Sequence, residues 1–207
     1  YGAERWINAL VSANTDDDIE YHIAITDEPE SSDDVLTRSI LPEGQKHRLR
    51  MSSKFDLLAV FRLARLLKER QIDIIHTHGY KSDILGVVAA RLAGVRSVCT
   101  PHGFENAEDT RLKAYMWLGG KAFHWFDQIC PLSEDIEKTV LHDYAVDSRS
   151  VRLINNGVDL AEVESAIADP KTLDASDFTI GYIGQLISRK NLAATLEAFA
   201  LFHGERP

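Results

Sequence analysis

Hydrophobic and polar positions change their spacing repeatedly along the chain, and this predicts helices and strands in alternation. Residues 2–13 and 52–71 carry apolar residues at helical spacing, whereas residues 19–26 alternate and are rich in β-branched side chains, which favours a strand. Further strands are predicted at 47–51, 72–78, 95–100, 127–133, from 150 and at 178–186, and further helices at 81–94, 107–126, 133–144 and 189–202. This alternation predicts an α/β fold with a parallel sheet and helices on both faces.

Histidines stand where two of the predicted strands end. His76 and His78 close the strand at 72–78, and His102 follows the strand at 95–100. Ligands of parallel sheets bind at the carboxyl ends of the strands, so we expect a site at this edge. Two histidines in an H-x-H pair face the same side of a strand and could suit a metal, but no third ligand has a clear spacing. For His76 a hydrogen-bonded core position remains an alternative.

Composition narrows the class of protein. The 207 residues are 44% hydrophobic and 27% charged, which is ordinary for a soluble globular chain with one full core. The formal net charge of −9 argues against nucleic acid as a partner. No apolar stretch reaches the roughly 20 residues of a membrane-spanning helix. Cys99 and Cys130 lie in apolar runs without a pairing or zinc pattern, which indicates a reducing compartment, and we expect a cytoplasmic protein.

Both ends of the chain look like cuts. The chain opens with "YGAERWINAL", without a methionine or a leading strand, and closes directly after a predicted helix. Residues 169–177 are polar and contain a proline, so they are interpreted as a linker. We therefore expect one nearly complete domain and the beginning of a second.

Six segments in a fixed order resemble one enzyme family. They are "GAER", "DIIHTHGYKSDILGVVAARLAGV", "TPHGF", "SE" before a helix, "INNGVD" and "IGYIGQLISRKNLAATLEAF". This order is similar to that of the retaining glycosyltransferases of family 4, which have the GT-B fold of two facing Rossmann-like domains. The resemblance implies that residues 1–170 are the N-terminal, acceptor-side domain without its first strand, and that residues 176–207 begin the domain that binds the nucleotide sugar.

The resemblance also implies an activity. Such an enzyme transfers a sugar from a nucleotide sugar to a glycan or lipid-linked acceptor with retention, without a metal or another cofactor, in cell-surface polysaccharide or glycolipid synthesis. We expect residues 1–207 by themselves to be inactive. Two alternatives stay open: a sugar-nucleotide 2-epimerase of the same fold, and a non-catalytic sugar- or nucleotide-binding module recruited to a membrane.

The first predicted helix offers a candidate anion site. Gly2 opens this helix, so free backbone N–H groups and the helix dipole could hold a phosphate or a carboxylate. The resemblance places Gly2 near the donor diphosphate and Glu4 near the acceptor. The alternative is an ordinary helix start at which Glu4 complements the dipole.

The resemblance assigns the acceptor pocket to the strand ends. It implies that His102 is the catalytic histidine, near the acceptor or the transferred sugar, where a neutral imidazole can exchange hydrogen bonds or a proton with a hydroxyl. Gly103 would permit close backbone approach, and His78 with Gly79 would shape the pocket. The alternative for His102 is a loop histidine bonded to the backbone.

The segment "GYIGQLISRKN" is the expected donor site. By resemblance, Gly184 and the basic pair Arg189 and Lys190 contact the donor diphosphate and neutralise its leaving charge. Gln185 stands where the family commonly has an arginine, and Arg189 is the candidate substitute for that charge. The alternative is an exposed basic helix start, which the helix dipole disfavours.

A basic segment lies between residues 46 and 70. It holds eight lysines and arginines against two acidic residues. Arg62, Arg65 and Lys68 share one face of the predicted helix, and the other face is apolar (Leu57, Val60, Leu63, Ala64, Leu67). The basic face is either a solvated surface or a patch for anionic lipid head groups or an anionic acceptor, which would make the protein peripheral at the inner face of the membrane.

Overall fold

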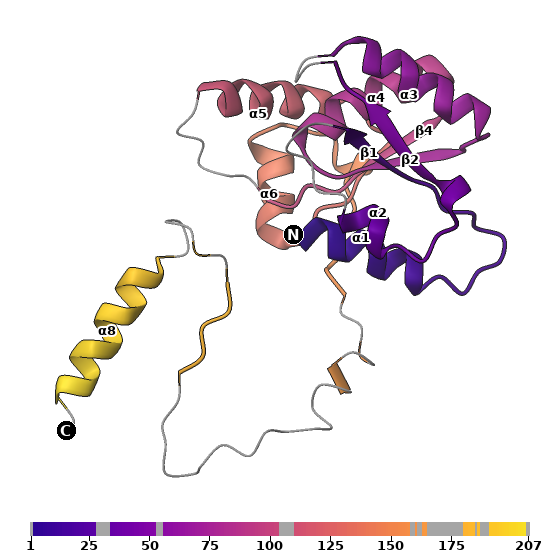
Figure 1. Ribbon diagram of the computed structural model, residues 1–207. Coiled ribbons are helices and arrows are strands. Elements are labelled where there is room, and N and C mark those ends of the chain that lie inside the picture. The colour runs from indigo at the N-terminus through magenta and orange to yellow at the C-terminus, as the bar shows by residue number, and fades with distance from the viewer. Residues whose placement is uncertain are drawn as a thin grey trace. The chain divides into compact units, whose positions relative to one another are not determined.

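The structure is a computed structural model of the 207-residue chain, shown in Figure 1. It describes residues 2–27, 34–52, 56–103, 110–157, 160, 163–164, 180–184, 186 and 191–205. The chain divides into two compact units, Tyr1–Leu160 and Ala161–Pro207, and each unit is described by itself.

The first unit is a parallel α/β structure. Strands β1 (Ile23–Asp27) and β2 (Lys46–Arg50) form one parallel pair. Strands β3 (Ile74–Thr77), β4 (Arg96–Cys99) and β5 (Gln128–Ile129) form a second parallel sheet in the order β3-β4-β5. The predicted α/β class and the parallel strand direction are confirmed. The single predicted sheet appears as two among the described residues.

Helices connect these strands, as Figure 1 shows. Their bounds are α1 Gly2–Ser12, α2 Asp34–Arg38, α3 Leu58–Glu69, α4 Tyr80–Ala93, α5 Thr110–Phe123 and α6 Glu134–His142, with 3-10 turns η1 Glu43–Gln45 and η2 Ser148–Ser150. Among the described helices, none has the length and apolar character needed to cross a bilayer.

Three groups of buried side chains stabilise the first unit. One group joins α4, α5 and α6 to β4 and β5, and it includes Phe123, Ile129 and Val140. A second packs α3 and α4 together beside β2. The third lies between α1, β1 and α2. Helix α4 contributes to the first two groups. This packing positions the start of α4 beside the end of β3.

Two predicted helix boundaries are confirmed by their caps. Gly94 follows α4 with a left-handed backbone (φ 76°), and its N–H reaches the carbonyl of Ala90. Ser133 accepts a hydrogen bond on its Oγ from the Ile136 N–H, 3.4 Å away, at the start of α6.

Helix α3 differs from its prediction. It begins at Leu58 instead of residue 52, and the carboxylate of Asp56 accepts hydrogen bonds from the N–H groups of Ser52 and Leu58. Leu57 was expected on the buried face but is 77% exposed, and it is the residue directly before the first turn of α3.

Gly119 and Gly120 do not interrupt the helix in which they lie. Helix α5 runs through both residues to Phe123. Gly120 is buried against the ring of Tyr144, and a Cβ at this position would collide with that ring. The glycine therefore serves close packing of α5 against the segment after α6, rather than a turn.

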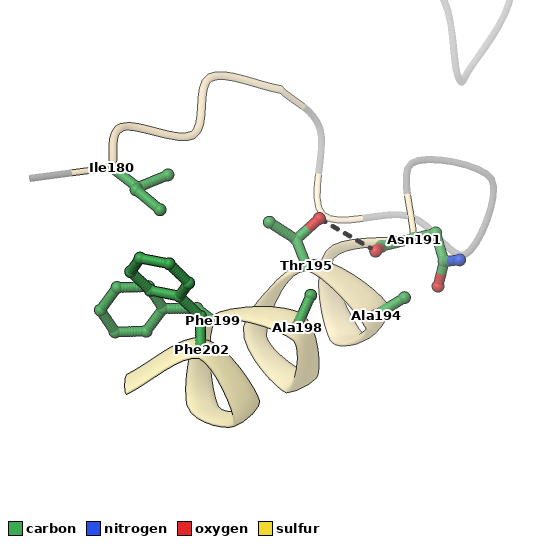
Figure 2. Close-up of a pocket in the computed structure, with 7 residues that line it drawn as sticks. All are labelled: Ile180, Asn191, Ala194, Thr195, Ala198, Phe199 and Phe202. Atoms are coloured by element: carbon green, nitrogen blue, oxygen red, sulfur yellow. Dashed lines mark hydrogen bonds between the residues drawn. The ribbon is translucent and has the colours of Figure 1, made fainter. Parts of the chain in front are cut away.

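The second unit contains α8 (Leu192–Glu205). The predicted strand at 178–186 is absent from its described positions, residues 180–184 and 186, since no described strand of this unit is available to pair with it. Figure 2 shows α8 with Ile180 beside it; Ala194, Ala198, Phe199 and Phe202 line an open hollow on this side of the helix. Apolar residues on several faces are typical of a helix that is covered on more than one side.

Candidate functional site

Two neighbouring strand ends bring the predicted histidines together. His76 lies in β3 opposite Val98 of β4, and the pairing continues past both strands because the Thr100 N–H donates to the Thr77 carbonyl at 3.0 Å. His78 and His102 then follow from the two strands at the same edge of the sheet. The expected gathering at the carboxyl ends of the strands is therefore observed.

The three imidazoles are in direct contact. Nδ1 of His78 lies 3.0 Å from Nε2 of His102, and Nε2 of His76 lies 2.7 Å from Oγ1 of Thr100. The ring centroids of His76 and His78 are 4.4 Å apart. His102 is exposed, whereas His76 and His78 are half-buried behind it. His102 is thus the member of this histidine cluster that a ligand in solution meets first.

Trp6 completes the histidine cluster from α1. Its ring centroid lies 5.7 Å from that of His76, 5.0 Å from that of His78 and 6.4 Å from that of His102. The sequence placed Trp6 only on the apolar side of the first helix, so this contact was missed. The one available signal was its position four residues after Gly2, one helical turn from the candidate anion site.

Glycines shape both loops of the site. Gly79 (φ 102°) and Gly103 (φ 124°) adopt backbone conformations that other residues rarely reach. A Cβ on Gly103 would meet no described protein atom within 4 Å, so within the described residues the φ angle explains this glycine, and close approach of a ligand to its backbone stays a prediction. The Tyr80 hydroxyl donates to the Gly103 carbonyl at 3.1 Å and joins the two loops.

A buried carboxyl group lies between the histidine strand and α4. Thr77, between His76 and His78, donates its hydroxyl to Oδ1 of Asp83 at 2.6 Å. Asp83 is only 1% exposed, and this burial raises the pKa of its carboxyl to about 7. Asp83 could not be singled out from the sequence, since an acidic residue in the first turn of a helix is ordinary.

Burial makes the histidine rings weak bases. It lowers the pKa of His76 to about 4 and that of His78 to about 3, and nearby rings add a smaller effect. The pKa of His102 is lowered by burial as well. At neutral pH the histidine cluster therefore offers uncharged donors and acceptors, which suit hydroxyl groups.

Within the described residues, no group of three or more histidines, cysteines or carboxylates is arranged to hold a metal ion.

The predicted donor residues, and Glu4 of the predicted acceptor pocket, lie in separate units or outside the described residues. Gly2 begins α1 and Glu4 lies in its first turn, so both belong to the first unit. Gly184 is an exposed residue of the second unit. Arg189 and Lys190 lie outside the described residues, and their roles stay predictions.

Two of the three residues of the predicted basic patch, Arg62 and Arg65, make contacts within the chain. The Arg62 guanidinium lies 2.7 Å from Oδ2 of Asp56 and donates to the Arg50 carbonyl at 2.8 Å. Arg65 pairs with Glu69 at 2.7 Å, one turn along α3, and Lys68 is exposed. Arg62 therefore anchors the start of α3 as well as contributing charge to its surface.

Comparison with known proteins identifies the family. The profile of Glycosyltransferase Family 4 matches residues 1–162, and the chain belongs to this family. The chain is 35% identical, over 147 residues, to the UDP-Gal:alpha-D-GlcNAc-diphosphoundecaprenol alpha-1,3-galactosyltransferase of Escherichia coli. This match covers 66% of the chain and 38% of the relative.

A solved structure supports the fold. The lipopolysaccharide outer core galactosyltransferase WaaB, in its apo form, is similar with a TM-score of 0.57 at 15% identity, over 76% of this chain and 43% of that one. A glycosyltransferase from Rickettsia africae matches with a TM-score of 0.43 at 20% identity, over 60% of this chain and 33% of that one. The chain thus spans less than half the length of the relatives that it matches.

Proposed function

We propose that this chain is the acceptor-binding part of a glycosyltransferase that moves a sugar, with retention, from a nucleotide sugar to a lipid-linked or glycan acceptor. The observation that carries the proposal is the cluster of His76, His78 and His102 with Trp6 at the carboxyl ends of β3 and β4. In a member of Glycosyltransferase Family 4, this is an aromatic, uncharged surface suited to a sugar with its hydroxyl groups.

The acceptor that we favour is a sugar carried on a lipid diphosphate. The E. coli relative is named for such an acceptor and for UDP-galactose as donor. In this proposal His102 contacts the reacting hydroxyl, and His78, Gly79, Gly103 and Glu4 line the acceptor pocket. The donor diphosphate is contacted by Gly2, Gly184, Arg189 and Lys190, without a metal ion.

Acceptor binding can be tested on the chain itself. A short-chain lipid diphosphate carrying N-acetylglucosamine is titrated while the Trp6 indole and the histidine ring resonances are followed by NMR. We expect shifts at Trp6 and His102, and we expect Trp6→Leu and His102→Gln to abolish them. Trp117→Leu, at another exposed tryptophan, is the matched control. Binding without any effect on these resonances, or no binding, would contradict the proposed acceptor site.

Transfer is tested on the natively expressed protein after its intact mass has been measured. We expect release of nucleoside diphosphate only when donor and acceptor are both present, and an α-anomeric product if retention holds. Residues 1–207 by themselves are expected to show no turnover. Donor epimerisation without an acceptor would favour the 2-epimerase alternative, and binding without turnover in the native protein would favour a non-catalytic module.

We also propose that α3 contacts an anionic membrane surface on the cytoplasmic side. Leu57, Leu58 and Phe61 are 77%, 60% and 62% exposed at the start of this helix, and the basic residues Arg65 and Lys68 follow on the same helix. Exposed apolar residues beside basic ones are typical of helices that lie in a membrane interface. We expect Leu58→Ser with Phe61→Ser to weaken co-sedimentation with anionic vesicles, and Lys68→Glu to do so in a salt-dependent manner.

Ile40→Ser is the control for this membrane test, because Ile40 is 70% exposed but lies outside α3. Arg62 is left unchanged, since replacing it would disturb its pairing with Asp56 as well as its surface charge. Equal binding of all variants to anionic and neutral vesicles would contradict the membrane contact.

A further inference from the structure

We infer that His78 is a positioning residue for His102: its Nδ1 accepts the Nε2–H of His102 and leaves Nδ1 of His102 as the bare nitrogen presented to the ligand. This inference rests on the proposed function only for the identity of that ligand, an acceptor hydroxyl. The hydrogen bond and the tautomers can be measured in the chain without any ligand.

The geometry selects the nitrogen that a ligand can reach. Nε2 of His102 already lies 3.0 Å from Nδ1 of His78, so it is occupied by a partner from the residue that follows β3. Nδ1 is the other ring nitrogen of His102, and this residue is exposed at the edge of the sheet. A ligand that bonds to the His102 ring therefore meets Nδ1.

Tautomer chemistry selects the direction of the hydrogen bond. Between two neutral rings in this contact, one of the two facing nitrogens carries the proton. If His102 donates from Nε2, both rings carry their proton on Nε2, which is the tautomer that neutral histidine prefers. If His78 donates from Nδ1, both rings must take the less favoured tautomer. The first arrangement is therefore the more stable one.

The surroundings keep His78 in the accepting state. His78 is half-buried between Trp6, His76 and His102, and this burial lowers its pKa to about 3. A neutral His78 remains an acceptor at neutral pH and does not compete with His102 as a base. Ser82 donates to the His78 carbonyl at 2.8 Å and fixes the backbone at the start of α4.

The arrangement has a chemical consequence for His102. A bare Nδ1 accepts a hydrogen bond from a hydroxyl, and it can take up the hydroxyl proton when that oxygen forms a new bond. The Nε2–H of the resulting imidazolium would keep its acceptor in His78, which stabilises the positive charge. Loss of His78 is therefore expected to lower the basicity of His102 as well as to free its ring.

The test is NMR of the ¹⁵N-labelled histidine rings in the 207-residue chain without any ligand. We expect a scalar coupling across the hydrogen bond between Nε2 of His102 and Nδ1 of His78, with the proton on His102. The pair of His22 and His47, whose ring nitrogens are 2.9 Å apart, is a built-in control for detecting such a coupling. A proton on Nδ1 of His78, or a coupling at His22–His47 but none at His78–His102, would overturn the inference.

Variants separate positioning from general stability. His78→Phe is expected to lower the pKa of His102, whereas His78→Asn, whose amide oxygen can take the place of Nδ1, should restore it. His124→Asn, at an exposed histidine, is the control. An unchanged His102 pKa in a folded His78→Phe would overturn the inference, and the measurement on the unsubstituted chain decides the matter if that variant does not fold.

A titration with the lipid diphosphate sugar then distinguishes the two claims. A shift of the His102 Nδ1 resonance supports both the acceptor site and the presented nitrogen. A confirmed coupling without a response to this ligand would leave the positioning role of His78 standing and contradict the proposed acceptor.

Discussion

Thr77 donates its hydroxyl to the buried carboxyl of Asp83 at 2.6 Å, and this bond ties the end of β3 to the first turn of α4. The donor, Thr77, lies between His76 and His78. The acceptor, Asp83, lies on α4, and Gly86 of this helix lets it approach Thr77 closely. The histidine cluster is therefore held on one side by a hydrogen bond to a carboxyl group whose ionisation is opposed by its burial.

Replacing Asp83 with asparagine should raise stability at alkaline pH. Burial raises the pKa of Asp83 from 3.8 to about 7 in the folded chain, so folding favours the protonated form. As pH rises from about 4 to 7, the unfolded chain has lost this proton while the folded chain still holds it, and the free energy of unfolding falls. The loss is on the order of 4 kcal/mol at a rate of about 1.4 kcal/mol per pKa unit.

The measurement is urea unfolding of both proteins at pH 5 and pH 8. Asparagine keeps an oxygen that accepts from Thr77 but does not ionise, so Asp83→Asn should gain more relative stability at pH 8 than at pH 5. Asp127→Asn is a control at a carboxylate that accepts hydrogen bonds from Ser97 but is exposed. The same stability difference at both pH values would contradict the prediction.

Gly86→Ala should destabilise the chain. A Cβ at Gly86 would collide with Cγ2 of Thr77, so α4 or the end of β3 must move. Overpacking of this kind costs about 1–3 kcal/mol. Gly44→Ala is the matched control, because a Cβ there meets no described atom within 4 Å and the residue is exposed in η1. Equal unfolding free energies for the two variants would show that α4 adjusts without strain.

Local spacing was enough to predict much of the fold. The apolar periodicity, the glycine after α4 and the serine before α6 each act within a few residues, so the sequence shows them directly. The role of Gly120 could not be predicted because it depends on Tyr144, more than 20 positions along the chain. The sequence pattern carries no sign of such a distant contact.

The candidate site was predicted in part for the same reason. His78 and His102 could be placed together because parallel strands end at one edge of a sheet. Trp6 and Asp83 were missed, since an apolar residue on one side of a helix and an acidic residue in a first helical turn are both ordinary. Each acquires its significance only from the neighbour that packing brings to it. The pairing of Arg62 with Asp56 was hidden because the helix begins later than its apolar pattern suggests.

Acid should weaken the fold through His76. Burial lowers its pKa from 6.5 to about 4, so folding favours the neutral ring. As pH falls below about 6.5, the unfolded chain binds a proton that the folded chain does not, and stability is lost down to about pH 4. The contribution is on the order of 3 kcal/mol. Unfolding of His76→Gln between pH 7 and 4 should show a shallower loss than that of the unsubstituted chain.

His124→Gln, at an exposed position, should keep the original pH dependence. Because His78 is also buried and also has a lowered pKa, part of the acid sensitivity should remain in His76→Gln. If the unfolding free energy of His76→Gln falls with pH as steeply as that of the unsubstituted chain, the His76 ring binds a proton as readily in the folded chain as in the unfolded chain, and the prediction is contradicted.

Asp56 should matter more for stability than other acidic residues of the basic segment. Its side chain is 4% exposed; Oδ2 accepts from Arg62 and from the Ser52 N–H, and Oδ1 accepts from the Leu58 N–H. The bond from Arg62 is the main cause that lowers the pKa of Asp56, so its stabilising effect is present above the usual carboxyl pKa and is lost as pH falls. We expect Asp56→Ala to lower the Tm at pH 7 clearly more than at pH 3.

Glu69→Ala is the matched control at the same helix. Glu69 also pairs with an arginine, Arg65, but both side chains are more than half exposed, so water replaces the lost contact and the Tm should hardly change. Asp56→Ala, in contrast, leaves the start of α3 without the acceptor for two backbone N–H groups and leaves Arg62 without its carboxylate. If both variants lower the Tm equally, the start of α3 does not depend on Asp56, and Arg62 becomes available as a surface charge for the proposed membrane contact.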